Sequence, residues 1–249
     1  MRYFLSLSYF GEAYHGWQRQ PNALTVQEVV ENALSTLMRS TLSIVGAGRT
    51  DTGVHAREIY AHFDTTAPIP SDLVKRLNRF LPDDIAINDL YAVPEDAHAR
   101  FSAVSRSYEY HIVRKKNPFY QNSAYLIQLP LNVDAMNEAA EMLKLYQDFE
   151  CFSKSNTDVK TFNCKISSAF WKEEGDLLIF KITADRFLRN MVRAIVGTLL
   201  DVGLGKLAPK DVKAIIKSKN RSEAGVSVPA KGLYLTRVEY PKSILKDDG

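Results

Sequence analysis

Residues 3–9 have the sequence Tyr-Phe-Leu-Ser-Leu-Ser-Tyr, in which apolar and polar positions largely alternate. This alternation is typical of a half-buried β-strand. The segment also lacks the small-residue cleavage site of a signal peptide, so we expect it to be part of the fold. Thr25 and Glu28 have the spacing of a capping box, which predicts that a helix starts there. Its apolar stripe at helical spacing consists of Val26, Val29, Val30, Ala33, Leu34 and Leu37.

The same order of elements is predicted twice along the chain. The first half continues with two strands, a helix capped by Ser71 and a further strand, at residues 42–45, 59–63, 71–80 and 85–93. The second half has a strand, a helix, a hairpin, a long helix and a last strand, at residues 108–113, 133–145, 162–183, 187–202 and 233–240. This repeat predicts an α+β fold of two ferredoxin-like (βαββαβ) halves. The expected domains are 1–104, which carries an aspartate loop, and 105–249, which completes the active site.

That loop, Gly48-Arg49-Thr50-Asp51-Thr52-Gly53-Val54-His55-Ala56, places one carboxylate between two glycines. Glycines allow a sharp bend, and an aspartate held in a cleft can act as a nucleophile or a base. The simpler alternative is a tight turn in which the aspartate binds its own backbone. An aspartic protease is a further alternative, but it needs two such carboxylates, and no second Asp-Thr-Gly or Asp-Ser-Gly occurs.

Composition favours a soluble intracellular enzyme. The chain has 249 residues, 45% hydrophobic and 24% charged, and a net charge of only +3, so any phosphate-binding surface must come from local clustering. Cys151 and Cys164 do not have metal-site spacing and are expected to be reduced. The five histidines are scattered, and nucleotide-binding glycine motifs are absent, so we expect neither a metal nor a cofactor. No apolar run is long enough to cross a membrane.

The Asp51 loop resembles the catalytic loop of the tRNA pseudouridine synthase A family. Further motifs of that family lie on both sides of the loop in the family's order, at residues 14–20, 25–27, 77–82, 99–103, 106–110, 148–152, 187–197 and 230–235. The chain departs from the family pattern at three positions. Phe10 stands where an aspartate is usual, Ala97 where a phenylalanine is common and Ile59 where a glutamine is common.

The resemblance implies a pseudouridine synthase fold, with sheets that flank a central catalytic cleft. It implies that uridines at positions 38, 39 and 40 of the tRNA anticodon stem-loop become pseudouridine, without a cofactor, in a cytoplasmic homodimer. Asp51 is the implied nucleophile, attacking either C6 of the base or C1′ of the sugar. Tyr108 is implied to pack on the uracil, and Arg193 to orient Asp51 through paired hydrogen bonds.

The remaining candidate residues are implied RNA contacts. Arg49 is expected near the flipped nucleotide, and four further arginines at phosphates: Arg100, Arg106, Arg186 and Arg189. Helical periodicity places Arg186, Arg189 and Arg193 along one edge of the predicted 187–202 helix. Tyr14, Trp17 and Tyr108 are candidates for stacking on bases. The alternative function is a non-catalytic RNA-binding module of ferredoxin-like fold, which would need exposed strand aromatics but not Asp51.

Overall fold

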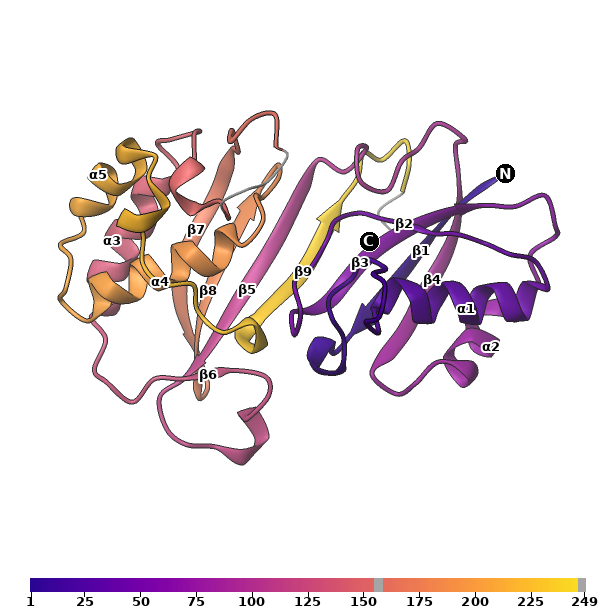
Figure 1. Cartoon of the computed structure of the whole chain (residues 1–249), viewed down its shortest axis with the longest axis horizontal. Coiled ribbons are helices and arrows are strands. Elements are labelled where there is room, and N and C mark those ends of the chain that lie inside the picture. The colour runs from indigo at the N-terminus through magenta and orange to yellow at the C-terminus, as the bar shows by residue number, and fades with distance from the viewer. Residues whose placement is uncertain (155–158, 246–249) are drawn as a thin grey trace. The chain divides into compact units, whose positions relative to one another are not determined.

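The computed structural model describes residues 1–154 and 159–245 and has a mixed α+β fold (Figure 1). It consists of two compact units. Unit 1 contains Met1–Val104 and the chain from Tyr234 onward, and unit 2 contains Ser105–Leu233. The last predicted strand therefore groups with unit 1, whereas the sequence placed it in the 105–249 half. In the described residues, no helix combines the length and apolar character that crossing a membrane requires.

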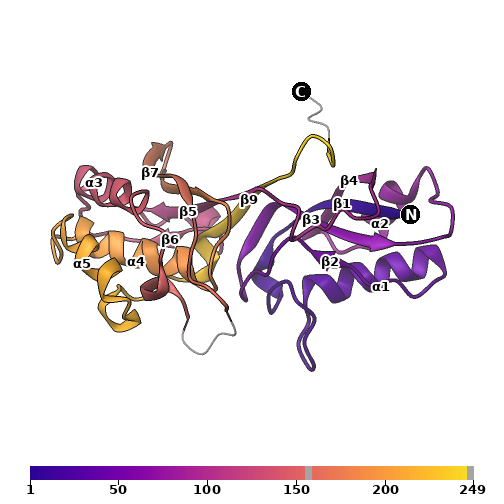
Figure 2. The same ribbon diagram turned by 90° about the horizontal axis from the view of Figure 1, so that it is seen from above.

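Unit 1 is built around strand β1 (Arg2–Tyr9), which pairs antiparallel with a strand on each side. Its other strands are β2 (Val45–Gly46), β3 (His55–Asp64), β4 (Ile85–Val93) and β9 (Leu233–Glu239), in the order β4-β1-β3-β9. Strand β2 pairs antiparallel with β3, and β9 pairs parallel with β3 at His55 and Tyr234. Helices α1 (Val26–Met38) and α2 (Leu73–Phe80) complete the unit, and Figure 2 shows α1 along one face of the strands.

The capping prediction for α1 is confirmed. The Thr25 hydroxyl accepts a hydrogen bond from the Glu28 amide at 3.4 Å, and Val26, Val30 and Leu34 are fully buried. A cap of this kind satisfies a backbone donor that the first helical turn leaves unpaired. The sequence therefore fixes both the start of α1 and the face that it buries.

Unit 2 contains an antiparallel sheet in the order β5-β8-β7 with helices packed beside it. The strands are β5 (Ser105–Val113), β6 (Tyr125–Leu126), β7 (Ile166–Glu174) and β8 (Leu177–Ala184), and β6 pairs parallel with β5. The helices are α3 (Val133–Leu143), α4 (Met191–Gly203) and α5 (Asp211–Ser218). Nearly all of α4 is buried, so this helix forms the centre of the unit 2 core.

Several predicted boundaries are wrong. The strand predicted at residues 42–45 is only the two-residue β2, and the strand expected from residue 162 begins at Ile166. Ser71 does not cap α2, because the Leu73 amide bonds to the Pro70 carbonyl in a preceding turn. The helix expected from residue 187 starts at Met191, and α5 was not predicted.

The late start of α4 changes the location of two candidate arginines. Asn190 has a left-handed backbone with φ of 66°, which interrupts the helix before Met191. Arg186 and Arg189 therefore lie in the loop between β8 and α4, and the predicted arginine edge of a single helix is wrong. Only Arg193 lies in the helix, in its first turn.

Candidate active site

The loop that carries Asp51 connects β2 to β3 and is fixed by backbone hydrogen bonds. The Trp17 amide donates to the Thr50 carbonyl at 3.2 Å, and the Gly53 amide donates to the Tyr14 carbonyl at 3.3 Å. The Val54 amide also donates to the Asp51 carbonyl at 3.1 Å, which closes the turn. Asp51 is half-buried. The residues on both sides of Asp51 are thus held against segment 14–17.

Glycines allow segment 11–17 to approach this loop closely. A Cβ added to Gly16, where φ is 86°, would lie 2.4 Å from the Thr50 carbonyl oxygen. A Cβ added to Gly11 would lie 2.0 Å from the Val54 carbonyl oxygen. Both distances are below any real non-bonded contact, so these positions require glycine. These contacts give a structural reason why Gly16 and Trp17 occur in the same chain as the Asp51 loop.

His55 holds the far end of the loop in place. Its ring lies 4.1 Å from the Phe10 ring and 4.6 Å from the Tyr234 ring. Its Nδ1 accepts a hydrogen bond from the Gly11 amide at 2.9 Å. The side chain is buried within unit 1. His55 therefore supports the loop. Separately, the part of the chain that the structure describes contains no group of three His, Cys, Asp or Glu residues able to hold a metal ion.

Tyr14 and Trp17 are buried, with only 3% and 2% of their surface exposed, so the prediction that they stack on bases is wrong. The Tyr14 hydroxyl donates to the Asp84 carboxylate at 2.5 Å. Burial, and then this hydrogen bond, raise the pKa of Tyr14 above its ordinary value. Tyr14 thus ties the segment beneath the loop to the start of β4.

In unit 2, Tyr108 lies on β5 opposite Ile182 of β8. Its ring meets the Phe187 ring edge-to-face, with centroids 5.1 Å apart and planes at 85°. Such T-shaped pairs are favourable because the positive edge of one ring faces the negative face of the other. Phe187 comes from the loop that the sequence assigned to a helix. The contact fixes the orientation of a half-buried tyrosine.

Arg193 is held by the segment that follows residue 224. Its Nε donates to the Val228 carbonyl at 2.7 Å, and the Val228 amide donates to the Arg193 carbonyl at 3.3 Å. Close contact at Gly197, whose added Cβ would lie 1.9 Å from the Val226 carbonyl oxygen, brings this segment onto α4. Arg193 and Asp51 belong to different units, so their pairing stays a prediction.

The loop before α4 is organised by Asp185, which the sequence analysis did not identify. Its carboxylate accepts from the amides of Lys165 and Arg186, each at 2.7 Å. Its carbonyl accepts from Arg106 Nη1 at 2.8 Å. This places Arg106 beside the loop that carries Arg186, and the loop extends to the exposed Arg189. Three of the predicted RNA contacts thus belong to one basic region of unit 2.

The other two predicted RNA contacts, Arg49 and Arg100, are exposed residues of unit 1. Arg49 lies on the Asp51 loop itself. Arg100 lies after β4, in a turn with its guanidinium carbon 5.6 Å from the centre of the Phe101 ring. Sequence motifs drew attention to Arg100, but its pairing with an exposed phenylalanine is visible only in the structure.

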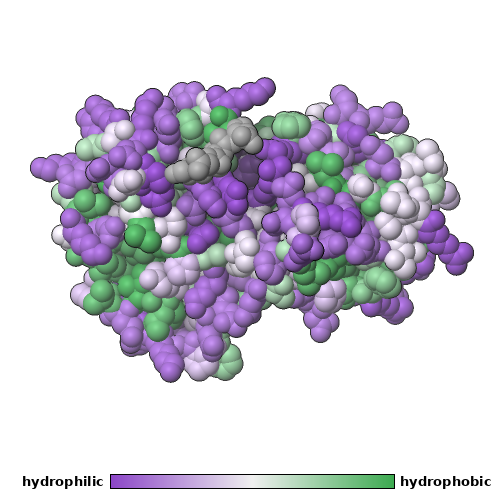
Figure 3. All heavy atoms as spheres, in the orientation of Figure 1, coloured by the Kyte–Doolittle hydropathy of each residue, from purple (hydrophilic) through white to green (hydrophobic). Residues whose placement is uncertain are grey.

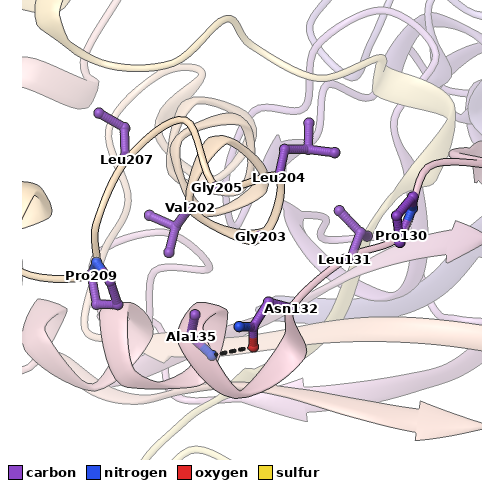
Figure 4. Close-up of a pocket in the computed structure, with 10 residues that line it drawn as sticks. All are labelled: Pro130, Leu131, Asn132, Ala135, Val202, Gly203, Leu204, Gly205, Leu207 and Pro209. Atoms are coloured by element: carbon purple, nitrogen blue, oxygen red, sulfur yellow. Dashed lines mark hydrogen bonds between the residues drawn. The ribbon is translucent and has the colours of Figure 1, made fainter.

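Two surface hollows differ in their chemistry. A hollow of about 400 Å³ in unit 1 is lined by residues that include Arg57, Asp83, Asp84 and Tyr234. A hollow of about 580 Å³ in unit 2 lies between α4 and the start of α3 and is lined mainly by apolar residues such as Leu131, Val202 and Leu204, without a titratable side chain (Figure 4). In Figure 3 most of the visible face is hydrophilic, and a patch of apolar residues covers the region of α4. Only the first hollow adjoins the elements that support Asp51.

Comparisons with known proteins identify relatives of this chain. A family model described as tRNA pseudouridine synthase matches residues 6–102 and 139–241, ranges that include Asp51 and Arg193 but not Arg106 or Tyr108. The tRNA pseudouridine synthase A of Parabacteroides distasonis is 52% identical over 246 residues, covering 98% of this chain and 97% of its own. The proteins of the same name from Porphyromonas gingivalis and Bacillus subtilis are 51% and 42% identical, with at least 96% of each chain covered.

The matched proteins share one enzyme class, since pseudouridine synthases are isomerases. Because the family model covers well over half of the chain and the identities far exceed 30% over nearly its full length, the assignment is direct. The chain belongs to the tRNA pseudouridine synthase family. The predicted family and enzyme class are thereby confirmed.

Proposed function

We propose that this chain converts uridine to pseudouridine at positions 38, 39 and 40 of the tRNA anticodon stem-loop, with Asp51 as the nucleophile. The tRNA pseudouridine synthase relatives support the reaction and its substrate class. One structural observation carries the residue assignment. Asp51 lies on a loop held by backbone hydrogen bonds at Thr50 and Gly53, and the residue itself is only half-buried. Such support lowers the cost of orienting a nucleophile.

The proposed chemistry breaks the N1–C1′ bond of uridine and forms a C5–C1′ bond. Asp51 attacks either C6 of the base or C1′ of the sugar, the N1–C1′ bond breaks, and the uracil turns. C5 then bonds to C1′, and the bond to Asp51 breaks and returns the free carboxylate. A proton leaves C5 and N1 gains one, so the atoms balance without a co-reactant. The target base must first leave the helical stack, at a cost of about a few kcal/mol.

Tyr108 and Arg193 are the proposed partners of Asp51. The T-shaped contact with Phe187 supports a fixed Tyr108 ring that packs on the uracil and assists removal of the C5 proton. The bond from Arg193 Nε to the Val228 carbonyl supports a guanidinium of defined orientation. We assign its two Nη groups to the Asp51 carboxylate, because parallel N–H···O bonds fix a carboxylate and keep it charged.

RNA binding is assigned to two sets of arginines. Arg49 fills the space of the flipped nucleotide or contacts its phosphate, and Arg100 contacts the backbone beside unit 1. In unit 2 the Asp185-organised loop, which carries Arg186 and Arg189 with Arg106 beside it, forms a phosphate-binding region. Local clustering of this kind is what a net charge of only +3 requires.

We further propose two ferredoxin-like halves that flank a catalytic cleft, in a cytoplasmic homodimer. The antiparallel pairing β4-β1-β3-β2 in unit 1 supports the first half. The antiparallel order β5-β8-β7 in unit 2 supports the second. The expected division, 1–104 and 105–249, is supported by the boundary at Val104, although the chain from Tyr234 onward groups with unit 1.

The test uses unmodified tRNA with tritium at C5 of its uridines. A pseudouridine synthase releases tritium to water, and sequencing of the product locates the modified positions. Release confined to positions 38–40 supports the proposal, whereas release elsewhere overturns the assigned positions. The alternative function, a non-catalytic RNA-binding module, predicts tRNA binding without any release.

A further inference from the structure

The turn that follows β4, residues 97–102, presents an aromatic side chain to solvent. Phe101 is 75% exposed. The ring of His98 packs against it with centroids 4.4 Å apart, and the Arg100 guanidinium carbon lies 5.6 Å from its centre. Exposed phenylalanine is unfavourable in water, and a neighbouring guanidinium over the ring forms a cation–π contact. The aromatic ring and the guanidinium thus present two flat groups on one exposed turn.

Hydrogen bonds within the turn hold this side chain in place. His98 Nδ1 accepts from the amides of Arg100 and Phe101, at 3.1 and 3.3 Å. The Ser102 hydroxyl accepts from the His98 amide at 2.9 Å, and the Ser102 amide donates to the His98 carbonyl at 2.9 Å. The backbone under Phe101 is therefore fixed by its own turn.

The turn is also anchored to the core of unit 1. The Ala99 amide donates to His62 Nδ1 at 3.1 Å, and the Tyr240 hydroxyl donates to the Ala99 carbonyl at 2.5 Å. Arg2 Nη1 donates to the Ala97 carbonyl at 2.8 Å. Burial lowers the pKa of His62 to about 4 and also lowers that of His98, so both rings are neutral near pH 7 and their Nδ1 atoms can accept these bonds.

The turn lies at the opposite end of β3 from the Asp51 loop. Asp51 precedes His55 at the start of the strand, whereas His62 near its end receives the Ala99 amide. Seven residues of extended strand span roughly 23 Å. A ligand on Phe101 is thus remote from the reacting uridine and can influence how substrate is bound rather than the bond-making step.

We propose that Phe101 and Arg100 form a stacking platform for an unpaired nucleobase of the tRNA substrate, separate from the catalytic site. The inference rests on the proposed function for its choice of RNA. Unpaired bases bind proteins by stacking on aromatic rings and guanidinium planes, and every base offers such a face. A protein partner is the alternative occupant, and the oligomeric state of the variant tests it below.

Phe101→Trp provides a direct probe. The chain has two tryptophans, Trp17 and Trp171, and both are buried. An indole at position 101 would therefore report the surface, and we expect tRNA to quench its fluorescence. Phe119→Trp is the matched control. Phe119 is 91% exposed and lies in the short turn Pro118–Tyr120, and no guanidinium of the described residues lies over its ring, so its indole should respond little.

The energetic test measures tRNA affinity by filter binding. Phe101→Ala should raise the Kd about 5- to 100-fold, the range expected for loss of one stacked base. The rise in KM should exceed any fall in kcat, and Phe101→Trp should keep the parental affinity. Phe119→Ala should leave all three values unchanged. Equal melting temperatures of parent and variants would show that the fold is intact.

Unchanged Kd in Phe101→Ala, or an equal response of the two indoles, would overturn the proposal. A smaller oligomer with parental tRNA affinity would assign Phe101 to a protein interface and overturn it as well. Failure of the proposed function is distinguishable, because the parent chain would then release no tritium from labelled tRNA. The platform is supported when Phe101→Ala binds tRNA more weakly than the parent chain and the parent chain releases tritium.

Discussion

Arg193 shows how one side chain can be fixed from its own unit before it meets a substrate. Its Nε bond to the Val228 carbonyl sets the plane of the guanidinium. Arg193→Met keeps the apolar stem but loses this bond and the proposed grip on Asp51. We expect about 2 kcal/mol lower stability, the usual cost of losing a hydrogen bond from a charged group. We also expect a fall of about 100-fold in single-turnover rate, because Asp51 loses its orientation.

Thermal melting and tritium release test both parts of this prediction. Arg193→Lys should keep the positive charge but recover little of the rate, since an ammonium lacks the planar fork. Arg114→Met is the control, because Arg114 is exposed, directly follows β5 and forms an ion pair with Glu173 at 3.2 Å. Parental melting and parental rate in Arg193→Met would remove Arg193 from the proposed mechanism.

Tyr108 allows packing and proton transfer to be separated. Tyr108→Phe keeps the ring and its T-shaped contact with Phe187 but removes the hydroxyl. If the hydroxyl assists loss of the C5 proton, tritium release should slow by about 100-fold or more while the Kd for tRNA stays constant. Deuterium at C5 should then give a larger isotope effect in the variant. An unchanged rate would limit Tyr108 to packing.

Among the elements, the close approach of segment 11–17 to the Asp51 loop depends on glycines, which have no side chain. Gly16→Ala adds a Cβ that would lie 2.4 Å from the Thr50 carbonyl oxygen at a positive φ. We expect a loss of about 1–3 kcal/mol from backbone strain and displacement of the loop. Activity should fall further than stability, because the displaced residue neighbours Asp51.

Gly48→Ala is a matched control for stability in the same loop. An added Cβ at Gly48 meets no atom within 4 Å, and Gly48 does not have a positive φ. Its melting temperature should equal that of the parent within error, whereas Gly16→Ala should melt several degrees lower. Equal melting of the two variants would contradict the close approach of segment 14–17 to the loop.

The order of elements could be predicted because local signals agree with one another. Strands β1 and β4, the capped start of α1 and the hairpin of β7 and β8 follow directly from periodicity and turn chemistry. The start of α4 could not be predicted, since Leu188 is buried in a loop and continues the apolar spacing of the helix. Only the left-handed Asn190 breaks that continuity, and periodicity does not report it.

The candidate site was predictable to the same limited extent. The motif around Asp51 identified the loop, but burial decided that Tyr14 and Trp17 support it rather than stack on bases. Asp185 was missed because a lone aspartate before two arginines has no distinctive pattern. Its role depends on contacts with Lys165 and Arg106, which are distant in sequence. Contacts between distant residues were the missing information in each case.

At the scale of the whole molecule, tRNA binding should depend on clustered charge. With a net charge of +3, affinity should fall steeply with salt, by a log–log slope of roughly −0.7 to −0.9 per phosphate contacted. Neutral substitution of Arg186 or Arg189 should reduce that slope by about one each. Lys206→Met, on an exposed residue after α4, is the control. A flat salt dependence in the parent would contradict a broad phosphate-binding surface.

The central claim is that Asp51 performs the chemistry, and Asp51→Asn tests it most directly. The amide has nearly the same shape but is not nucleophilic. Tritium release from C5-labelled tRNA and filter binding should be measured on the same preparation, with the exposed turn variant Asp176→Asn as the control. We expect no detectable release by Asp51→Asn, a Kd within about twofold of the parent, and full activity in the control. Appreciable release by Asp51→Asn at saturating tRNA would contradict it.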